Sequence, residues 1–154
     1  QHSTGRPIDS DKNVFWSHYS DVEKTPLFPF GFGLSYTQFE YSDIRLDRSG
    51  ISGNESTKVR FKLKNTGKRD GDEVVQLYIK DVLSSIVRPV QELKGFQRIH
   101  LKAGEEREIV FEITPELLEQ LDAALKTLVE PGIFRIMIGC SSRDLPLKAD
   151  LEVK

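Results

Sequence analysis

Three carboxylates at Asp70, Asp72 and Glu73 come closest to a recognisable chemical site, because clustered carboxylates bind calcium. The best-known calcium loop needs about twelve residues, a bidentate glutamate at its end and a helix on each side. Here the cluster falls in a short turn, Asp70-Gly-Asp-Glu73, which is flanked by strand-like sequence. We therefore expect a structural turn, with a metal site as the minor alternative.

The remaining carboxylates, the cysteine and the histidines are not spaced as catalytic or metal-binding residues are. Glycosidic hydrolysis commonly uses two carboxyl groups held around the bond, and every Asp and Glu here falls in an expected turn or on the polar side of a strand. Cys140 follows an apolar strand without a nearby histidine, which favours an inert buried thiol. His2, His18 and His100 are not spaced for metal ligation. We expect no catalytic residue, no cofactor-binding residue and no metal ligand in this chain.

Gly31-Phe-Gly-Leu-Ser-Tyr36 begins like a dinucleotide-binding loop. It lacks the third glycine, and Pro29 prevents the strand that would precede such a loop. We expect instead a loop between aromatic residues, with a permissive backbone position at each of its two glycines.

The composition is that of a folded domain and argues against two classes of partner. The chain has 154 residues, of which 30% are charged and 38% hydrophobic, and a formal net charge of −2. This charge offers no basic field to a nucleic acid or an anionic membrane, and no apolar stretch approaches the ~20 residues of a membrane span. A single cysteine excludes a disulfide framework. The opening residues, 1–7, read like the interior of a longer protein.

Residues 1–36 are expected to form an irregular arm, which holds seven of the 14 aromatic side chains. Pro26, Pro29, Gly31 and Gly33 interrupt any regular structure there. Such a segment differs from a flexible linker, which would be rich in glycine and serine or in charge. We expect the arm to lie against another surface.

The expected docking residues of the arm are Phe28, Phe30, Phe32 and Tyr36. The three phenylalanines occupy every second position, so in an extended chain they would line one side. Without a partner, residues 26–36 are expected to fold back on the rest of the chain, and residues 1–14 to be less ordered.

From residue 37 onward the sequence alternates as β-strands do. In Lys58–Lys64 one face is apolar and the other carries four basic residues, which predicts a half-buried strand with a solvated basic face; binding of sulfate or a polysaccharide is the alternative. Further strands are expected over 73–80, 90–96, 98–101, 106–114, 133–139 and 145–153, with a kink at Gly95. Thr114-Pro115 predicts the start of a short helix, and the segment up to Val129 suits a helix or, at 126–129, an edge strand.

The strand pattern predicts an all-β protein. About seven strands over residues 37–154, separated by turn residues, are typical of an immunoglobulin-like or fibronectin type III-like β-sandwich. The Cys…Trp…Cys pattern of immunoglobulin domains is missing, which favours the fibronectin-like form. The expected core is Val59, Phe61, Leu63, Val75, Leu77, Ile79, Ile109, Phe111, Ile113, Phe134, Ile136 and Ile138.

One string is far more specific than the rest. Pro26-Leu-Phe-Pro-Phe-Gly-Phe-Gly-Leu-Ser-Tyr-Thr37 resembles the segment that leads into the C-terminal fibronectin type III-like domain of glycoside hydrolase family 3 enzymes, chiefly β-glucosidases. The motifs at 65–78, 88–96, 129–132 and 137–144 are similar to successive parts of that domain, and residues 4–7 to the end of the domain before it. The resemblance covers nearly the whole chain and fits least well over 120–127.

The resemblance implies residues 1–36 as a linker arm from a preceding catalytic domain and residues 37–154 as the fibronectin type III-like domain. Family members hydrolyse terminal β-D-glucosyl residues with an aspartate nucleophile and a glutamate acid/base, both carried by other domains. The chain would then be a non-catalytic accessory domain that braces the catalytic domains, with a β-glucoside or oligosaccharide as the parent enzyme's substrate. The resemblance favours a periplasmic or secreted parent and leaves the cytoplasm open.

The alternative is a free-standing carbohydrate-binding or adhesion module. Such modules stack sugars on exposed aromatic side chains of a strand face. Beyond Tyr41 the remaining aromatic residues are few, and alternation turns most of them inward, which favours the brace. They are Phe61, Tyr78, Phe96, Phe111 and Phe134.

Overall fold

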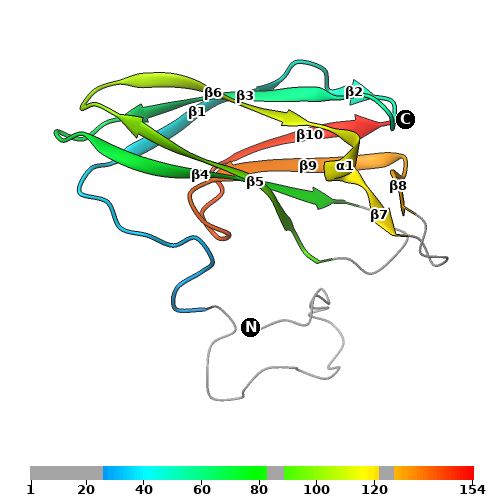
Figure 1. Cartoon of the computed structure of the whole chain (residues 1–154), viewed down its shortest axis with the longest axis horizontal. Coiled ribbons are helices and arrows are strands. Elements are labelled where there is room, and N and C mark those ends of the chain that lie inside the picture. Colours follow the sequence, from blue (N-terminus) through cyan, green and yellow to red (C-terminus); the bar gives the residue numbers. More distant parts are fainter. Residues whose placement is uncertain (1–25, 83–88, 122–126) are drawn as a thin grey trace, which may run out of the picture.

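The computed structural model describes residues 26–82, 89–121 and 127–154 (Figure 1). Its elements in chain order are β1 (Phe39–Leu46), β2 (Gly50–Ile51), β3 (Thr57–Asn65), β4 (Gly71–Asp81), β5 (Glu92–Leu101), β6 (Glu106–Ile113), α1 (Pro115–Leu118), β7 (Gln120–Leu121), β8 (Thr127–Leu128), β9 (Gly132–Gly139) and β10 (Leu147–Val153).

Two sheets lie face to face. One has three strands in the order β1-β3-β6, and the other has five in the order β2-β10-β9-β4-β5. The pairs are antiparallel except that of β10 with the two-residue strand β2, which is parallel. The all-β sandwich predicted from the alternation is therefore confirmed. Its seven long strands agree with the expected number, and the others described, β2, β7 and β8, have two residues each.

The core lies between the two sheets and contains every residue expected there. All twelve predicted core side chains are buried, and Phe61 at the centre is completely so. The Phe61 ring stacks between Tyr41 and Phe111, at centroid distances of 6.2 and 6.3 Å. Alternation predicts this well because successive side chains of a strand point to opposite faces.

The region expected to contain two short strands with a kink at Gly95 is one strand, β5. Leu77 of β4 faces Gly95 and Tyr78 faces Leu93, so Lys94 is an extra residue in β5. This is a β-bulge, which absorbs an additional residue without ending the strand. The expectation of two strands was wrong for that reason.

The expected helix is a single turn, α1, which begins after Thr114 with a proline in its first positions. Glu119 has a ψ of 148° and leaves the helix, after which β7 pairs with β8. Of the two alternatives for this segment, the strand is therefore the observed one at Thr127–Leu128. Residues 122–126 lie outside the described part of the chain.

Candidate docking surface

The arm segment, residues 26–36, carries six exposed large apolar side chains, among them the three most exposed in the described chain. Tyr36 is 93% exposed, Phe30 68%, Phe28 66% and Phe32 48%. Exposed apolar side chains gathered on one segment are characteristic of an interaction site. The four residues expected to dock thus stand at the surface of this chain.

The phenylalanines do not line one side of an extended segment, so that expectation was wrong. Residues 29–32 form a tight turn in which the Phe32 N–H donates to the Pro29 carbonyl at 3.0 Å. Gly31 has a φ of +81°, the value that a type II turn requires at its third residue. The turn brings the Phe28 and Phe32 rings to a centroid distance of 5.2 Å. Of the two glycines expected to need permissive backbone angles, only Gly31 has a positive φ.

The arm segment is held to the sandwich at two places. The Ser142 N–H, in the loop between β9 and β10, donates to the Phe30 carbonyl at 2.8 Å. Gly31 lies directly on Gln76 of β4, so close that a Cβ at Gly31 would be 2.1 Å from Gln76 Nε2. The expectation that residues 26–36 fold back on the sandwich is therefore confirmed, whereas residues 1–14 lie outside the described part.

Gln76 forms the base on which the arm rests. This buried side chain donates to the Cys140 carbonyl at 2.7 Å and accepts a hydrogen bond from the Tyr78 hydroxyl at 2.7 Å. Gln76 and Tyr78 point away from the core, yet both are buried, so the middle of β4 is covered on both faces. The sequence of β4 predicts burial of one face only, because the segments that cover its other face, the arm and the loop after β9, are distant in the chain.

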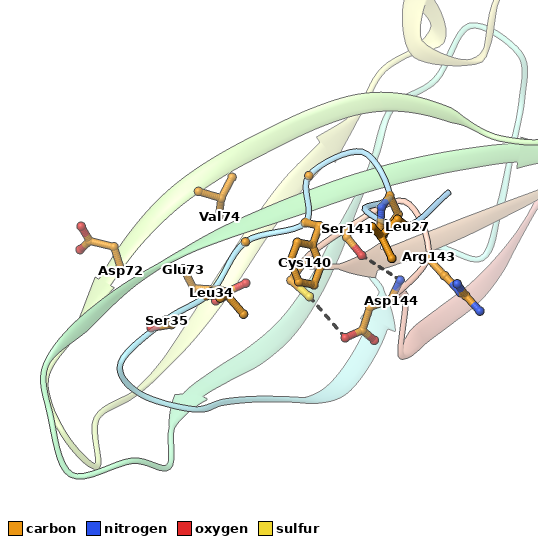
Figure 2. Close-up of a pocket in the computed structure, with 14 residues that line it drawn as sticks. Leu27, Leu34, Ser35, Asp72, Glu73, Val74, Cys140, Ser141, Arg143 and Asp144 are labelled. Atoms are coloured by element: carbon orange, nitrogen blue, oxygen red, sulfur yellow. Dashed lines mark hydrogen bonds between the residues drawn. The ribbon is translucent and has the colours of Figure 1, made fainter. Parts of the chain in front are cut away.

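A pocket of about 650 Å³ lies between the arm, β4 and the loop after β9. Figure 2 shows arm residues such as Leu34 beside Glu73 and Val74 of β4, with Cys140 and Asp144 across the pocket. The walls combine apolar side chains with carboxylates, so the pocket offers both kinds of contact to a partner.

The Glu73 carboxyl in this pocket is held by a tyrosine. The Tyr41 hydroxyl donates to Glu73 Oε1 at 3.0 Å and joins β1 to β4. Burial raises the pKa of Glu73 above its usual range, against the lowering effect of the hydrogen bond from Tyr41, and nearby Asp144 adds to the rise. Burial and the neighbouring carboxylate also raise the pKa of Tyr41, which keeps the phenol protonated as a donor.

Cys140 is a poor nucleophile in this setting. Its thiol donates to Asp144 Oδ2 at 3.4 Å, and burial raises its pKa to about 12, with Asp144 adding to the rise. Since the thiolate is the reactive species, the thiol stays unreactive near neutral pH. This agrees with the predicted inert cysteine, although the residue is only partly buried.

The carboxylates of Asp70, Asp72 and Glu73 have three separate sets of partners. Asp70 accepts from the Ala103 N–H at 2.9 Å, Asp72 binds Arg98 and His100, and Glu73 binds Tyr41. In the described residues no group of three His, Cys, Asp or Glu side chains could hold a metal ion. The expectation of a turn over Asp70–Glu73 was wrong, because only Asp70 precedes β4, whereas Asp72 and Glu73 lie within it and pair with His100 and Ile99 of β5.

Acidic neighbours form ion pairs with two of the four basic residues on the polar face of β3. Arg60 forms ion pairs with Asp47 at 2.7 Å and Glu108 at 3.3 Å, and Lys62 pairs with Asp43 at 2.9 Å. Exposed pairs of this kind contribute little to stability. They leave the face polar, as expected for a surface in contact with water.

Sequence reasoning did not single out seven of the exposed large apolar residues in the described chain: Leu27, Leu34, Val74, Val90, Leu93, Phe96 and Ile133. Leu27 and Leu34 belong to the arm, and Phe96 lies on the outer face of β5, 68% exposed. The two leucines could have been found from their position beside the aromatic residues. Phe96 could have been found as well, because alternation back from the inward Ile99 and Leu101 of the same strand turns it outward.

Comparison with known proteins places this geometry in a larger context. Residues 73–142 match the model of the fibronectin type III-like domain. The thermostable beta-glucosidase B of Acetivibrio thermocellus is 47% identical over 141 residues, which cover 91% of this chain and 19% of that protein. A beta-xylosidase of Formosa agariphila is 48% identical over 84% of this chain and 18% of its own length.

A solved structure agrees with the sequence relatives. The β-glucosidase of Listeria innocua, determined in complex with glucose, superposes with a TM-score of 0.84 at 38% identity and covers 97% of this chain. This chain corresponds to 21% of that protein, so it spans about a fifth of the length of the proteins it matches. No described helix is long and apolar enough to cross a bilayer.

Proposed function

The chain belongs to the fibronectin type III-like accessory domains of family 3 β-glucosidases, and on that premise we propose that it braces the catalytic domains of a larger hydrolase through its aromatic arm. The arm is residues 1–36 and the accessory domain residues 37–154. The parent reaction proposed is hydrolysis of terminal non-reducing β-D-glucosyl residues of a β-glucoside or oligosaccharide. Because one relative is a β-xylosidase, the sugar is the part of this proposal to test first.

The observation that carries this proposal is an apolar arm fixed on a rigid base. Phe28, Phe30 and Phe32 are about half to two-thirds exposed, while the backbone between them is tied to Ser142 and Gln76. Full burial of such a side chain is worth about 1.5–3 kcal/mol, so covering the exposed part of each ring would contribute about 1–2 kcal/mol. A prearranged segment also loses little conformational entropy on docking.

The alternative, a free-standing carbohydrate-binding or adhesion module, has less support. Phe61, Tyr78, Phe111 and Phe134 are buried, so they cannot stack on a sugar. Among the described aromatic residues of the strands, only Phe96 is exposed on a sheet face. A single aromatic ring is a small platform, whereas the arm offers several apolar side chains to a protein surface.

The test compares the same substitutions in two settings. Phe28→Ser, Phe30→Ser and Phe32→Ser are combined in the full-length parent enzyme and in the isolated chain, and thermal unfolding of this domain is followed in both. In the isolated chain the rings are already exposed, so the change should be small. In the parent the same variant should lower the melting temperature clearly more.

Ile133→Ser is the matched control, because Ile133 is 45% exposed on β9, outside the arm. It should have equal effects in the two settings. If the triple arm variant also has equal effects, the bracing role is refuted. Retention of the isolated chain on a β-glucan column, lost on Phe96→Ser, would support the carbohydrate-binding alternative instead.

A further inference from the structure

We infer that the outer face of β5 and the arm form one docking surface for the catalytic part of the parent chain, with Phe96 as its second anchor. This docking strip consists of the arm segment 26–36 together with the exposed apolar residues Val74, Val90, Leu93 and Phe96. The inference rests on the proposed function and adds to it the sandwich residues that take part.

A single residue joins the two halves of the strip. The Ser142 N–H donates to the Phe30 carbonyl at 2.8 Å, and the Ser142 carbonyl accepts from Gln91 Nε2 at 2.6 Å. Gln91 immediately precedes β5 and lies between Val90 and Leu93 in sequence. The turn of the arm and the entry to β5 are therefore fixed to the same point of the loop between β9 and β10.

The ladder between β4 and β5 brings Phe96 to the same place. Gln76, on which Gly31 of the arm lies, is the direct pairing partner of Phe96. Paired residues of an antiparallel ladder point to the same side of the sheet, so the Phe96 side chain emerges beside the arm. In Figure 1 the arm segment, in blue, accordingly runs from the start of β1 to the side of the five-stranded sheet.

The two sheets differ in the large apolar side chains that they expose. None of the exposed large hydrophobic residues in the described chain belongs to β1, β3 or β6. That sheet carries instead a set of ion pairs, among them Arg45 with Glu108 and Arg60 with Asp47. The five-stranded sheet also carries ion pairs, such as Asp72 with Arg98 and Asp150 with Arg135. Of these two sheets, it alone adds exposed large apolar side chains among the described residues, and these are what a protein surface can cover.

The length of the chain relative to its relatives points to the remainder of the parent chain as the partner that covers the docking strip. The chain spans about a fifth of its relatives, so most of the parent lies outside it. A standard interface of about 800 Å² per partner needs some 20–30 residues on each side. The described arm segment has 11 residues, fewer than such an interface uses, and exposed apolar side chains of the sandwich can add to its contact. The apolar end of β5 is the neighbouring surface with the right chemistry.

Phe96→Ser in the full-length parent tests the inference, with Phe30→Ser as the reference, since both rings are 68% exposed. Hydrogen exchange of the β5 amides is measured in the parent and in the isolated chain. We expect exchange in the parent to be about tenfold slower than in the isolated chain, and Phe96→Ser to abolish that difference. Ile133→Ser serves as control and should leave it unchanged.

The outcomes separate this inference from the proposed function. If Phe30→Ser weakens docking and Phe96→Ser does not, the inference is overturned while the bracing role stands. If neither substitution acts differently in the parent, the bracing role itself fails. Sedimentation of the isolated chain covers the other occupant: we expect a monomer, and a dimer that Phe96→Ser dissociates would make a second copy the partner and overturn the inference.

Discussion

Replacing Gly31 with alanine should release the arm without unfolding the sandwich. Gly31 has a φ of +81°, a conformation that costs a residue with a side chain roughly 1–2 kcal/mol. The new Cβ would also stand 2.1 Å from Gln76 Nε2, so the Gln76 side chain must move. That movement would weaken or break the hydrogen bonds of Gln76 with Cys140 and Tyr78, each of which contributes about 1 kcal/mol to stability.

The sum is roughly 2–4 kcal/mol if the arm stays in place, which corresponds to about a 30-fold to several-hundredfold change in the equilibrium for arm opening. The chain can avoid this cost by detaching the arm, because the strands of the core do not depend on the turn at Gly31. Gly31→Ala should therefore lower the stability of the arm contact far more than that of the sandwich.

Amide hydrogen exchange resolves the two effects. The Ser142 N–H, which donates to the Phe30 carbonyl, should exchange much faster in Gly31→Ala, while the Leu77 amide in the middle of β4 should change little. Gly33→Ala is the matched control, since Gly33 has an ordinary φ and nothing within 4 Å of a Cβ. Equal Ser142 exchange in the two variants would refute the contact between the arm and Gln76.

Further predictions concern the core, two titratable groups and activity. Phe111→Ala should lower the free energy of unfolding by about 3–5 kcal/mol in urea denaturation, because the ring is buried against Phe61; a loss below about 1 kcal/mol would contradict its central position. Glu73→Gln should gain stability relative to the unsubstituted chain as pH rises above 4.5, the ordinary pKa of glutamate. The folded-state pKa of Glu73 is raised, so its neutral carboxyl stabilises the fold fully below the unfolded-state pKa, and this stabilisation is lost as pH rises through the folded-state pKa. The amide of the variant does not titrate, and Tyr41 can still donate to its oxygen. Stability curves that stay parallel across this range would argue against it. The Cys140 thiol should react with a thiol reagent faster with each step in pH up to about 10, since its pKa is about 12; a plateau near pH 9 in the folded chain would show that its environment is different. The isolated chain should hydrolyse neither chromogenic β-glucosides nor β-xylosides, and turnover that survives repurification would contradict the absence of a catalytic pair.

The sequence predicts the core and the sheets because their signal is local. In β3 and β6 every second residue is apolar, and the two strands need only pair in register for those faces to meet. The bulges are not predictable in this way. The extra residue at Lys94 and the register shift of β1 near Asp43 depend on how each strand fits a partner that is distant in the chain.

The candidate site is predictable only in its side chains. The aromatic content of the arm predicts Phe28, Phe30 and Phe32 as docking residues, and the structure shows that they are exposed. Their arrangement depends on a turn closed between Pro29 and Phe32 and on a tether from the Ser142 backbone, and backbone groups carry no residue-specific signal.

The strand order also has a consequence for synthesis of the protein. The three-stranded sheet needs no residue beyond Ile113, whereas the five-stranded sheet is incomplete until β10 inserts between β2 and β9. The ribosome adds the 40 residues from Ile113 to Val153 in about 2–8 s at ordinary elongation rates. During that interval the apolar face of β3 has only part of its facing layer, so its side chains are less protected from water than in the finished sandwich.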